Sequence, residues 1–447
     1  MTGQEEQEKA RACAIAFVEC CWFMKELFPS MLCVRQRFET ALPLDVEAAI
    51  SKGFEAIRPQ IKPGMRVALG VGSRGISNLS KIVLMIVQEL KSAGAMPFII
   101  PAMGSHGGAT AEGQVALLAG YGVTEARMGV PIRPSMEVKQ LGKSDTGRDV
   151  LWSQEATTAD GVLVINRIKP HTDFSGKIGS GLMKMLVVGL GKHAGASAYH
   201  SGALTIGYEQ ELIDLTKVVL AKAPILGGIA IVEDAMHQLA SLEVVPADSI
   251  LIREPELCEM AKKLMPTIPF DEIDLLIVDQ IGKNISGMGM DTNIIKRGVH
   301  GYHLTPGISK SKPFIWRIFV RDLTAETHGN AIGIGMAEAT TKRLVEKIDA
   351  SALHTNVITA RSVQCAKLPM IFDTDSEAIK AMLESLPDAN PAKARVVRIK
   401  DTLTLGELEI STALEQTSIA HPAITSIEQM GQMSFDQNGN LKPITHG

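Results

Sequence analysis

Short, strongly apolar segments alternate with glycine-containing turns and helix-like segments through the first half of this chain. MRVALGVG (65–72), MPFIIPAMG (96–104) and VLVI (162–165) each have the length and character of a buried strand. The amphipathic segment LSKIVLMIVQELKSAGA (79–95) separates the first two. Strand, turn and helix in close succession are typical of a parallel sheet with crossover helices. We therefore predict an α/β fold with a Rossmann-like, parallel-sheet N-terminal domain.

The length of the chain predicts more than one domain. A chain of 447 residues exceeds what one hydrophobic core usually supports. Two prolines precede the strand-like segment IDLLIVDQ (273–280), so we place a boundary near residue 271. The expected organisation is an N-terminal extension, a catalytic and cofactor-binding domain, a smaller α/β C-terminal domain, and a closing segment that packs back and ends in a tail. The corresponding ranges are 1–30, 31–271, 272–395 and 396–447.

Composition and charge exclude several classes of function. A net charge of −4 gives no reason to expect nucleic acid or an anionic membrane as partner, and 4% aromatic residues leave little for base stacking. The six cysteines contain no CxxC pair, which argues against a zinc cluster. No apolar run reaches membrane-spanning length, and the residues before the apolar stretch 14–24 are net acidic, unlike a signal peptide. We expect a cytoplasmic protein.

The residues that carry chemistry concentrate between Asn166 and His200. His171 follows a proline directly after a predicted strand, which suits a positioned general base, although a structural histidine is an equal alternative. Lys184 lies on a predicted apolar helix (182–190), where a desolvated amine can be a nucleophile or a cofactor anchor. A lysine whose stem merely covers that helix is the more common case. His200 is a metal ligand or a structural histidine.

A glycine-rich run joins His171 to Lys184. GKIGSG (176–181) opens the predicted helix, and helix N-termini present free N–H groups to anions, so Gly176, Gly179, Ser180 and Gly181 form a candidate phosphate cradle. The run matches neither the P-loop order nor a GxGxxG fingerprint that directly follows a strand. By itself, this glycine-rich run is weak evidence for a phosphate site.

Three further candidates lie on other turns. His106 lies in GSHGG after a predicted strand, where glycines let the backbone approach a ligand, or it is a surface turn histidine. Arg74 in GSRG and Lys283 in GKN are cations on turns of separate predicted domains. Together they can bind a carboxylate, or each is a solvated charge.

Taken together, these residues resemble the nickel-pincer lactate racemase family. The similarity extends from about residue 33 to about residue 415 and is strongest in three blocks, with a fourth that opens the second domain. These are GSRGIS (72–77), MGSHGGAT (103–110), KPHTDFSGKIGSGLMK (169–184) with His200, and QIGKNISGMGMD (280–291). The chain departs from lactate racemase at Met183, where that enzyme has arginine, and in GVGSR (70–74), where it has Asp-x-Thr-Arg.

The resemblance implies a cofactor and a set of roles. The cofactor is a nickel-pincer nucleotide, pyridinium-3-thioamide-5-thiocarboxylic acid mononucleotide, which holds Ni²⁺ by one carbon and two sulfurs in the cleft between the domains. Lys184 is the implied tether and His200 the implied nickel ligand. His106 and His171 are the implied acid/base pair, while Arg74, Lys283 and Gln280 are implied to hold the substrate carboxylate.

These roles imply an isomerase, a racemase or epimerase that acts on a 2-hydroxy acid by reversible hydride transfer. The implied partners are this substrate and the proteins that synthesise the cofactor, and a homo-oligomer is compatible with the sequence. Two alternatives stay open. One is a nickel-free dehydrogenase or lyase on the same fold, and the other is a non-catalytic ligand-binding protein.

Overall fold

The computed structural model describes residues 28–72, 75–302, 311–388 and 390–444. These residues form two compact units. One comprises 39–265 with 359–361, and the other comprises 28–38, 266–358 and 362–444. We call them the N-terminal and the C-terminal unit. The prediction of a two-domain α/β chain is confirmed.

The N-terminal unit is built on a five-stranded sheet. In the described part of the chain its strand order is β3-β2-β6-β7-β8. The first four strands are mutually parallel and β8 runs antiparallel to β7, so the predicted parallel sheet is present. The strands are β2 (Arg66–Val71), β3 (Met96–Pro101), β6 (Gly161–Arg167), β7 (Ile225–Glu233) and β8 (Leu239–Pro246).

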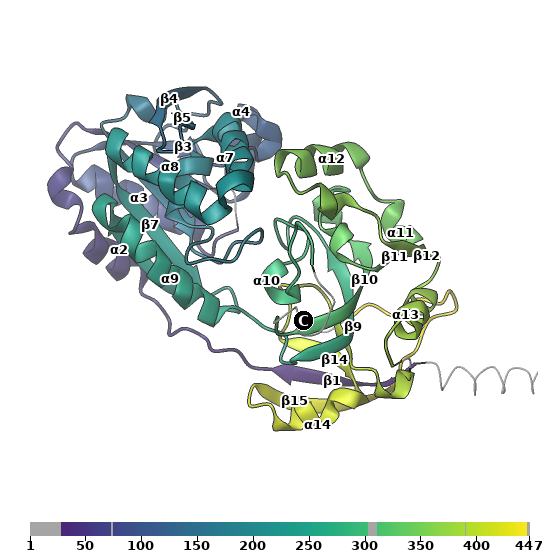
Figure 1. Ribbon diagram of the computed structural model, residues 1–447. Coiled ribbons are helices and arrows are strands. Elements are labelled where there is room, and N and C mark those ends of the chain that lie inside the picture. The colour runs from purple at the N-terminus through teal and green to yellow at the C-terminus, as the bar shows by residue number, and fades with distance from the viewer. Residues whose placement is uncertain (1–27, 73–74, 303–310, 389, 445–447) are drawn as a thin grey trace, which may run out of the picture. The chain divides into compact units, whose positions relative to one another are not determined.

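Helices cover both faces of this sheet, which explains its nearly continuous apolar strands. In β6, Val162 and Val164 pack into one core cluster, and Leu163 and Ile165 into another. Helices on opposite faces of the sheet contribute apolar side chains to the two clusters (Figure 1). They include α7 (Lys192–Ile206), α8 (Tyr208–Lys222) and α9 (Ile250–Leu264) on one face, and α2 (Val46–Phe54) and α3 (Leu79–Ser92) on the other.

Smaller elements complete this unit. Thr110 caps α4 (Ala111–Gly120) by accepting a hydrogen bond from the N–H of Gly113, and α5 (Glu125–Met128) follows. A two-stranded antiparallel ribbon, β4 (Val138–Lys143) and β5 (Asp149–Ser153), lies between α5 and β6 in the chain.

The C-terminal unit contains a mixed sheet whose order, in the described residues, is β12-β11-β10-β9-β13-β14-β1-β15. Its strands are β1 (Ser30–Gln36), β9 (Glu272–Ile281), β10 (Phe314–Leu323), β11 (Ala339–Thr341), β12 (Met370–Phe372), β13 (Val396–Ile399), β14 (Glu407–Ser411) and β15 (Ile424–Gln432). Its helices are α10 (Thr292–Ile295), α11 (Lys342–Val345), α12 (Ala350–Thr359), α13 (Asp375–Glu384) and α14 (Glu415–Ala420).

Strand β1 differs from the expected organisation, in which residues from 31 onward belong to the N-terminal domain. It pairs antiparallel with β14 on one side and β15 on the other, and it buries Leu32 and Val34 completely. Residues 396–432 add three strands, β13, β14 and β15, to this second sheet. The expected extension, residues 1–30, lies almost wholly outside the described residues.

In the described part of the chain, no helix is both long enough and apolar enough to cross a membrane.

Candidate active site

The order of the parallel strands marks the place where a ligand site is expected. From β2 the chain passes to β3 on one side and later returns to β6 on the other side of β2. In open α/β sheets, ligands bind outside the carboxyl ends of the strands at such a switch point. His171 follows β6 and His106 follows β3, so both lie beyond the same edge of the sheet. Arg74, which follows β2, lies outside the described residues.

His171 and Lys184 are in direct contact at this edge. The Lys184 Nζ lies 2.5 Å from the Nε2 of His171. The other ring nitrogen, Nδ1, accepts a hydrogen bond of 3.0 Å from the backbone N–H of Asp173. His171 is 5% exposed and Lys184 is half-buried. Both ring nitrogens of His171 are therefore engaged within the protein.

A series of aromatic rings links His171 to His200. Phe174 stacks on His171 with ring centroids 4.6 Å apart, and Tyr208 stacks on Phe174 at 5.7 Å. Tyr208 then meets His200 edge to face at 6.3 Å. The Nδ1 of His200 is buried and has no hydrogen-bond partner among the described residues.

Burial keeps both histidines uncharged. Burial is the largest cause that lowers the pKa of His171 to about 3, and Lys184, wherever it is protonated, acts in the same direction. Burial and Lys184 lower the pKa of His200 to about 4 in the same way. Burial acts to raise the pKa of Asp173, but His171, Lys184 and His200 outweigh it and the pKa is lowered. Near neutral pH the site thus contains two neutral imidazoles and one carboxylate.

The glycine-rich run 176–181 is closed by two glutamates, unlike the open anion cradle that we expected. The N–H of Lys177 donates to Glu209 at 2.7 Å, and the N–H of Met183 donates to Glu254 at 2.8 Å. Glu254 is 1% exposed and comes from α9. An anion at these N–H groups would have to displace a carboxylate, because the donors that helix starts offer are already used.

The glycines of this run provide close contacts within the protein. A Cβ on Gly176 or Gly181 would overlap the carboxylate of Glu209 or Glu254. A Cβ on Gly179 would lie 2.3 Å from the carbonyl oxygen of Lys169. Here Lys169 and Ser180 form a two-way backbone bridge that folds the His171 loop back toward Lys184.

The helix that carries Lys184 is irregular, whereas the sequence predicts one continuous helix over 182–190. A short α-helix, α6 (Leu182–Lys184), passes into a π-helix over Met185–Gly189. Trp152 donates its indole N–H to the carbonyl of Leu186 at 2.9 Å, and the N–H of Gly104 donates to the carbonyl of Gly189 at 3.2 Å. Such π-turns are rare and occur frequently at functional sites.

These contacts also fix the loop that carries His106. Gly104 binds the π-helix, and Gln114 donates to the carbonyls of Gly104 and His106. The fully buried Lys192, at the start of α7, donates to the carbonyl of Pro101 at 2.6 Å, and burial lowers its pKa to about 8. The loop of His106 is thus attached to the element that follows Lys184.

The remaining predicted residues lie in the C-terminal unit. Gln280 is the second-last residue of strand β9, and Lys283 follows that strand. The Nζ of Lys283 donates to the side chain of Asn356 at 3.0 Å.

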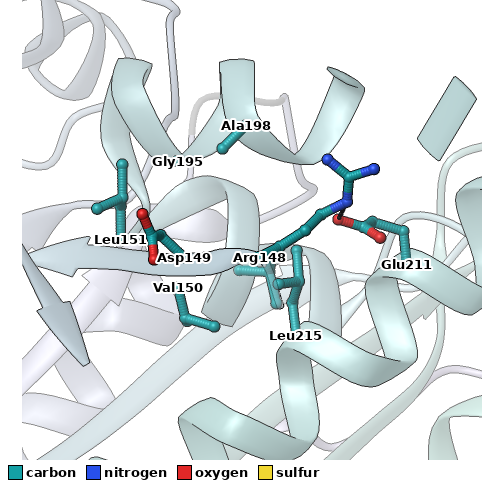
Figure 2. Close-up of a pocket in the computed structure, with 9 residues that line it drawn as sticks. Arg148, Asp149, Val150, Leu151, Gly195, Ala198, Glu211 and Leu215 are labelled. Carbon is teal, nitrogen blue, oxygen red and sulfur yellow. Dashed lines mark ion pairs between the residues drawn. The ribbon is translucent and has the colours of Figure 1, made fainter. Parts of the chain in front are cut away.

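A separate small cavity lies in the N-terminal unit between β5, α7 and α8. It has a volume of about 10 Å³, room for about one water molecule, and Arg148 and Glu211 line it (Figure 2). The two side chains form an ion pair, with Nε and Oε1 3.2 Å apart, and Glu211 is 1% exposed. Burial raises the pKa of Glu211. This cavity contains none of the predicted site residues.

Sequence reasoning missed several residues of the site. Asp173 lies two positions after His171, so its proximity was a usable signal. Tyr208 and Glu254 come from α8 and α9, and no local pattern connects them with Lys184.

The fold and the site together define an α/β protein with a histidine–lysine centre at the carboxyl edge of a parallel sheet. Residues 45–211 match the family model described as the lactate racemase N-terminal domain. Over these residues the chain is similar to the lactate racemase family, as the motifs predicted. It is also similar in structure to the lactate racemase apoprotein from Thermoanaerobacterium thermosaccharolyticum, with 13% sequence identity and a TM-score of 0.51. That similarity covers 83% of this chain and 94% of the other. A comparison with curated proteins found no match.

Proposed function

We propose that this protein is a racemase or epimerase of a 2-hydroxy acid that uses a nickel-pincer nucleotide. The observation that carries the proposal is the contact between Lys184 and His171, with the buried His200 linked to them through aromatic rings. All three residues lie within the span that matches the lactate racemase N-terminal domain.

The described residues fit such a cofactor. They contain no group of three or more His, Cys, Asp or Glu side chains that could hold a metal ion. A cofactor that brings its own carbon and sulfur donors needs only one ligand from the protein, and His200 offers a buried Nδ1 without a partner. Lys184 supplies an amine for a covalent tether.

The histidines would move the proton of the substrate hydroxyl. When bound, the cofactor supplies a ring that accepts and returns hydride. His106 and His171 follow neighbouring parts of one sheet edge, so each can serve one enantiomer as acid or base. Asp173, charged and 3.9 Å from the Nδ1 of His171, stabilises the protonated ring when His171 takes up a proton.

The substrate carboxylate would be held by two cations, Arg74 and Lys283, and by the side-chain amide of Gln280, as the family resemblance implies. A guanidinium binds a carboxylate with two parallel hydrogen bonds and so orients the C2 carbon.

The test is turnover of single-enantiomer 2-hydroxy acids in D₂O by protein produced together with cofactor-synthesis proteins. Hydride transfer keeps the C2 hydrogen, so we expect inversion without deuterium at C2, and intact mass should show an adduct on Lys184. Replacing His106 or His171 by Ala should lower kcat by about 10²–10⁴-fold. No inversion of any such acid by adduct-bearing protein, or deuterium at C2 in every turnover, would contradict the proposal.

A further inference from the structure

We propose that His171, through its Nε2–H, holds Lys184 as an uncharged amine and so makes this lysine a nucleophile toward an activated acyl compound. This inference deepens the proposed function. It rests on that function in one respect: the acylation of Lys184 would serve to attach the cofactor. The hydrogen bonds themselves are features of the protein without cofactor.

The direction of the hydrogen bonds follows from the partners of the ring. A neutral imidazole has one N–H and one nitrogen lone pair. The backbone N–H of Asp173 can only donate, so the Nδ1 that it contacts at 3.0 Å carries the lone pair. The single ring proton is therefore on Nε2.

The same reasoning gives the state of Lys184. An ammonium group has three donors and no acceptor. Because Nε2 donates, the Nζ at 2.5 Å must accept, and only the uncharged amine has a lone pair with which to do so. The opposite arrangement, an ammonium that donates to Nε2, would put the ring proton on Nδ1 against the N–H of Asp173.

The surroundings agree with a neutral pair. His171 is 5% exposed, and burial disfavours a charge on its ring. The titratable groups that face the ring are Lys184, Asp173, Lys169 and His200. Asp173 is the one anion among them, and its Oδ1 lies 3.9 Å from Nδ1, beyond hydrogen-bond distance.

An uncharged Lys184 can complete an acyl transfer without prior deprotonation. The Nζ lone pair forms the N–C bond to the acyl carbon, and the bond to the leaving group breaks with its electron pair. The leaving group, a thiolate or a phosphate ester, takes the proton that Nζ loses. The resulting amide nitrogen no longer accepts a hydrogen bond, so the Nε2–H of His171 becomes available to a substrate oxygen.

The experiment is pulse acetylation of the cofactor-free full chain with acetic anhydride near pH 7, read by peptide mass spectrometry. Lys177, an exposed lysine in the same segment, is the internal reference. We expect Lys184 to acetylate at least about tenfold faster than Lys177, because a surface lysine is almost wholly protonated at this pH.

Two variants distinguish the effect of the Nε2–H hydrogen bond from the effect of the size of the His171 ring. In His171→Gln the side-chain N–H can replace Nε2–H, and most of the excess reactivity should remain. In His171→Leu it should fall to the level of Lys177. Equal rates for Lys184 and Lys177 in wild type, or undiminished reactivity in His171→Leu, would overturn the proposal.

A measurement on the wild-type protein covers the case in which His171→Leu does not fold. Ring ¹⁵N chemical shifts of His171, assigned by their loss in His171→Gln, should place the proton on Nε2; a proton on Nδ1 overturns the proposal. Neither readout needs nickel or turnover. A protein that racemises but fails these tests loses only this inference, and one that passes but never racemises loses only the proposed function.

Discussion

At the residue scale, Glu254 determines how the helix that carries Lys184 begins. Its carboxylate accepts hydrogen bonds from the N–H groups of Leu182 and Met183, directly before Lys184. Burial raises the pKa of Glu254 to about 7, and those two N–H groups oppose the rise only in part. Glu254 is therefore a positioning residue for Lys184 and a buried acid that titrates near neutral pH.

This titration makes stability depend on pH in a defined direction. The pKa of Glu254 is about 7 in the folded protein and near 4.5 in the unfolded chain. Between these values the folded protein retains a proton that the unfolded chain has lost, so the free energy of unfolding falls as pH rises. Glu254→Gln removes this dependence. Relative to wild type, the variant should gain stability between about pH 5 and about pH 8, as measured by urea unfolding.

Glu254→Ala serves as the matched comparison. It leaves the N–H groups of Leu182 and Met183 buried without an acceptor, which should lower the free energy of unfolding by about 1–3 kcal/mol. If the free energies of unfolding of Glu254→Gln and wild type differ by the same amount at about pH 5 and about pH 8, Glu254 does not titrate as described.

At the element scale, the loop from His171 to Lys184 is folded by a close backbone contact at Gly179. The bridge between Lys169 and Ser180 brings two backbone segments together, and a Cβ on Gly179 would lie 2.7 Å from the backbone N of His171. The three atoms nearest to that Cβ are all backbone atoms, so the loop cannot adapt by a side-chain rotation. Glycine is required here for space.

Gly179→Ala should therefore open the bridge and displace His171 from Lys184. We expect the excess acetylation rate of Lys184 over Lys177 to fall severalfold, with a loss of stability of about 1–3 kcal/mol. Gly120→Ala is the control, because a Cβ at Gly120 meets no atom within 4 Å. Equal effects of the two substitutions would show that the contact at Gly179 does not position the pair.

At the scale of the whole molecule, the C-terminal unit depends on a strand from the start of the described chain. β1 lies between β14 and β15, and pairs with both. Burial of Leu32 and Val34 each stabilises the folded unit by roughly 1.5–3 kcal/mol, in addition to the backbone hydrogen bonds. Without β1, two strands lose a neighbour at once.

A chain that begins at residue 39 should thus have a less stable C-terminal unit. We expect scanning calorimetry to show a transition at lower temperature that is absent from the full chain. A chain that begins at residue 28 is the control, because it retains every strand that the structure describes. Identical thermal profiles for the two truncated chains would show that β1 contributes little to the sheet.

The sequence by itself predicted the segments whose burial is visible locally. Strands β2, β3, β6 and β9 are short apolar runs, and a run buried on both faces needs no knowledge of its partners to be recognised. His171 and Lys184 were found because both lie in one stretch, and the lactate racemase-like motifs brought them together with His200.

The tertiary structure decided what each segment packs against. Glu254 and Tyr208 reach the site from helices that are distant along the chain. Strand β1 joins the sheet of the C-terminal unit, although its own sequence does not indicate which strands it pairs with. The π-helix after Lys184 also depends on donors from Trp152 and Gly104. Local periodicity reports that a segment is buried. The choice of neighbour depends on the packing of residues far apart in the chain.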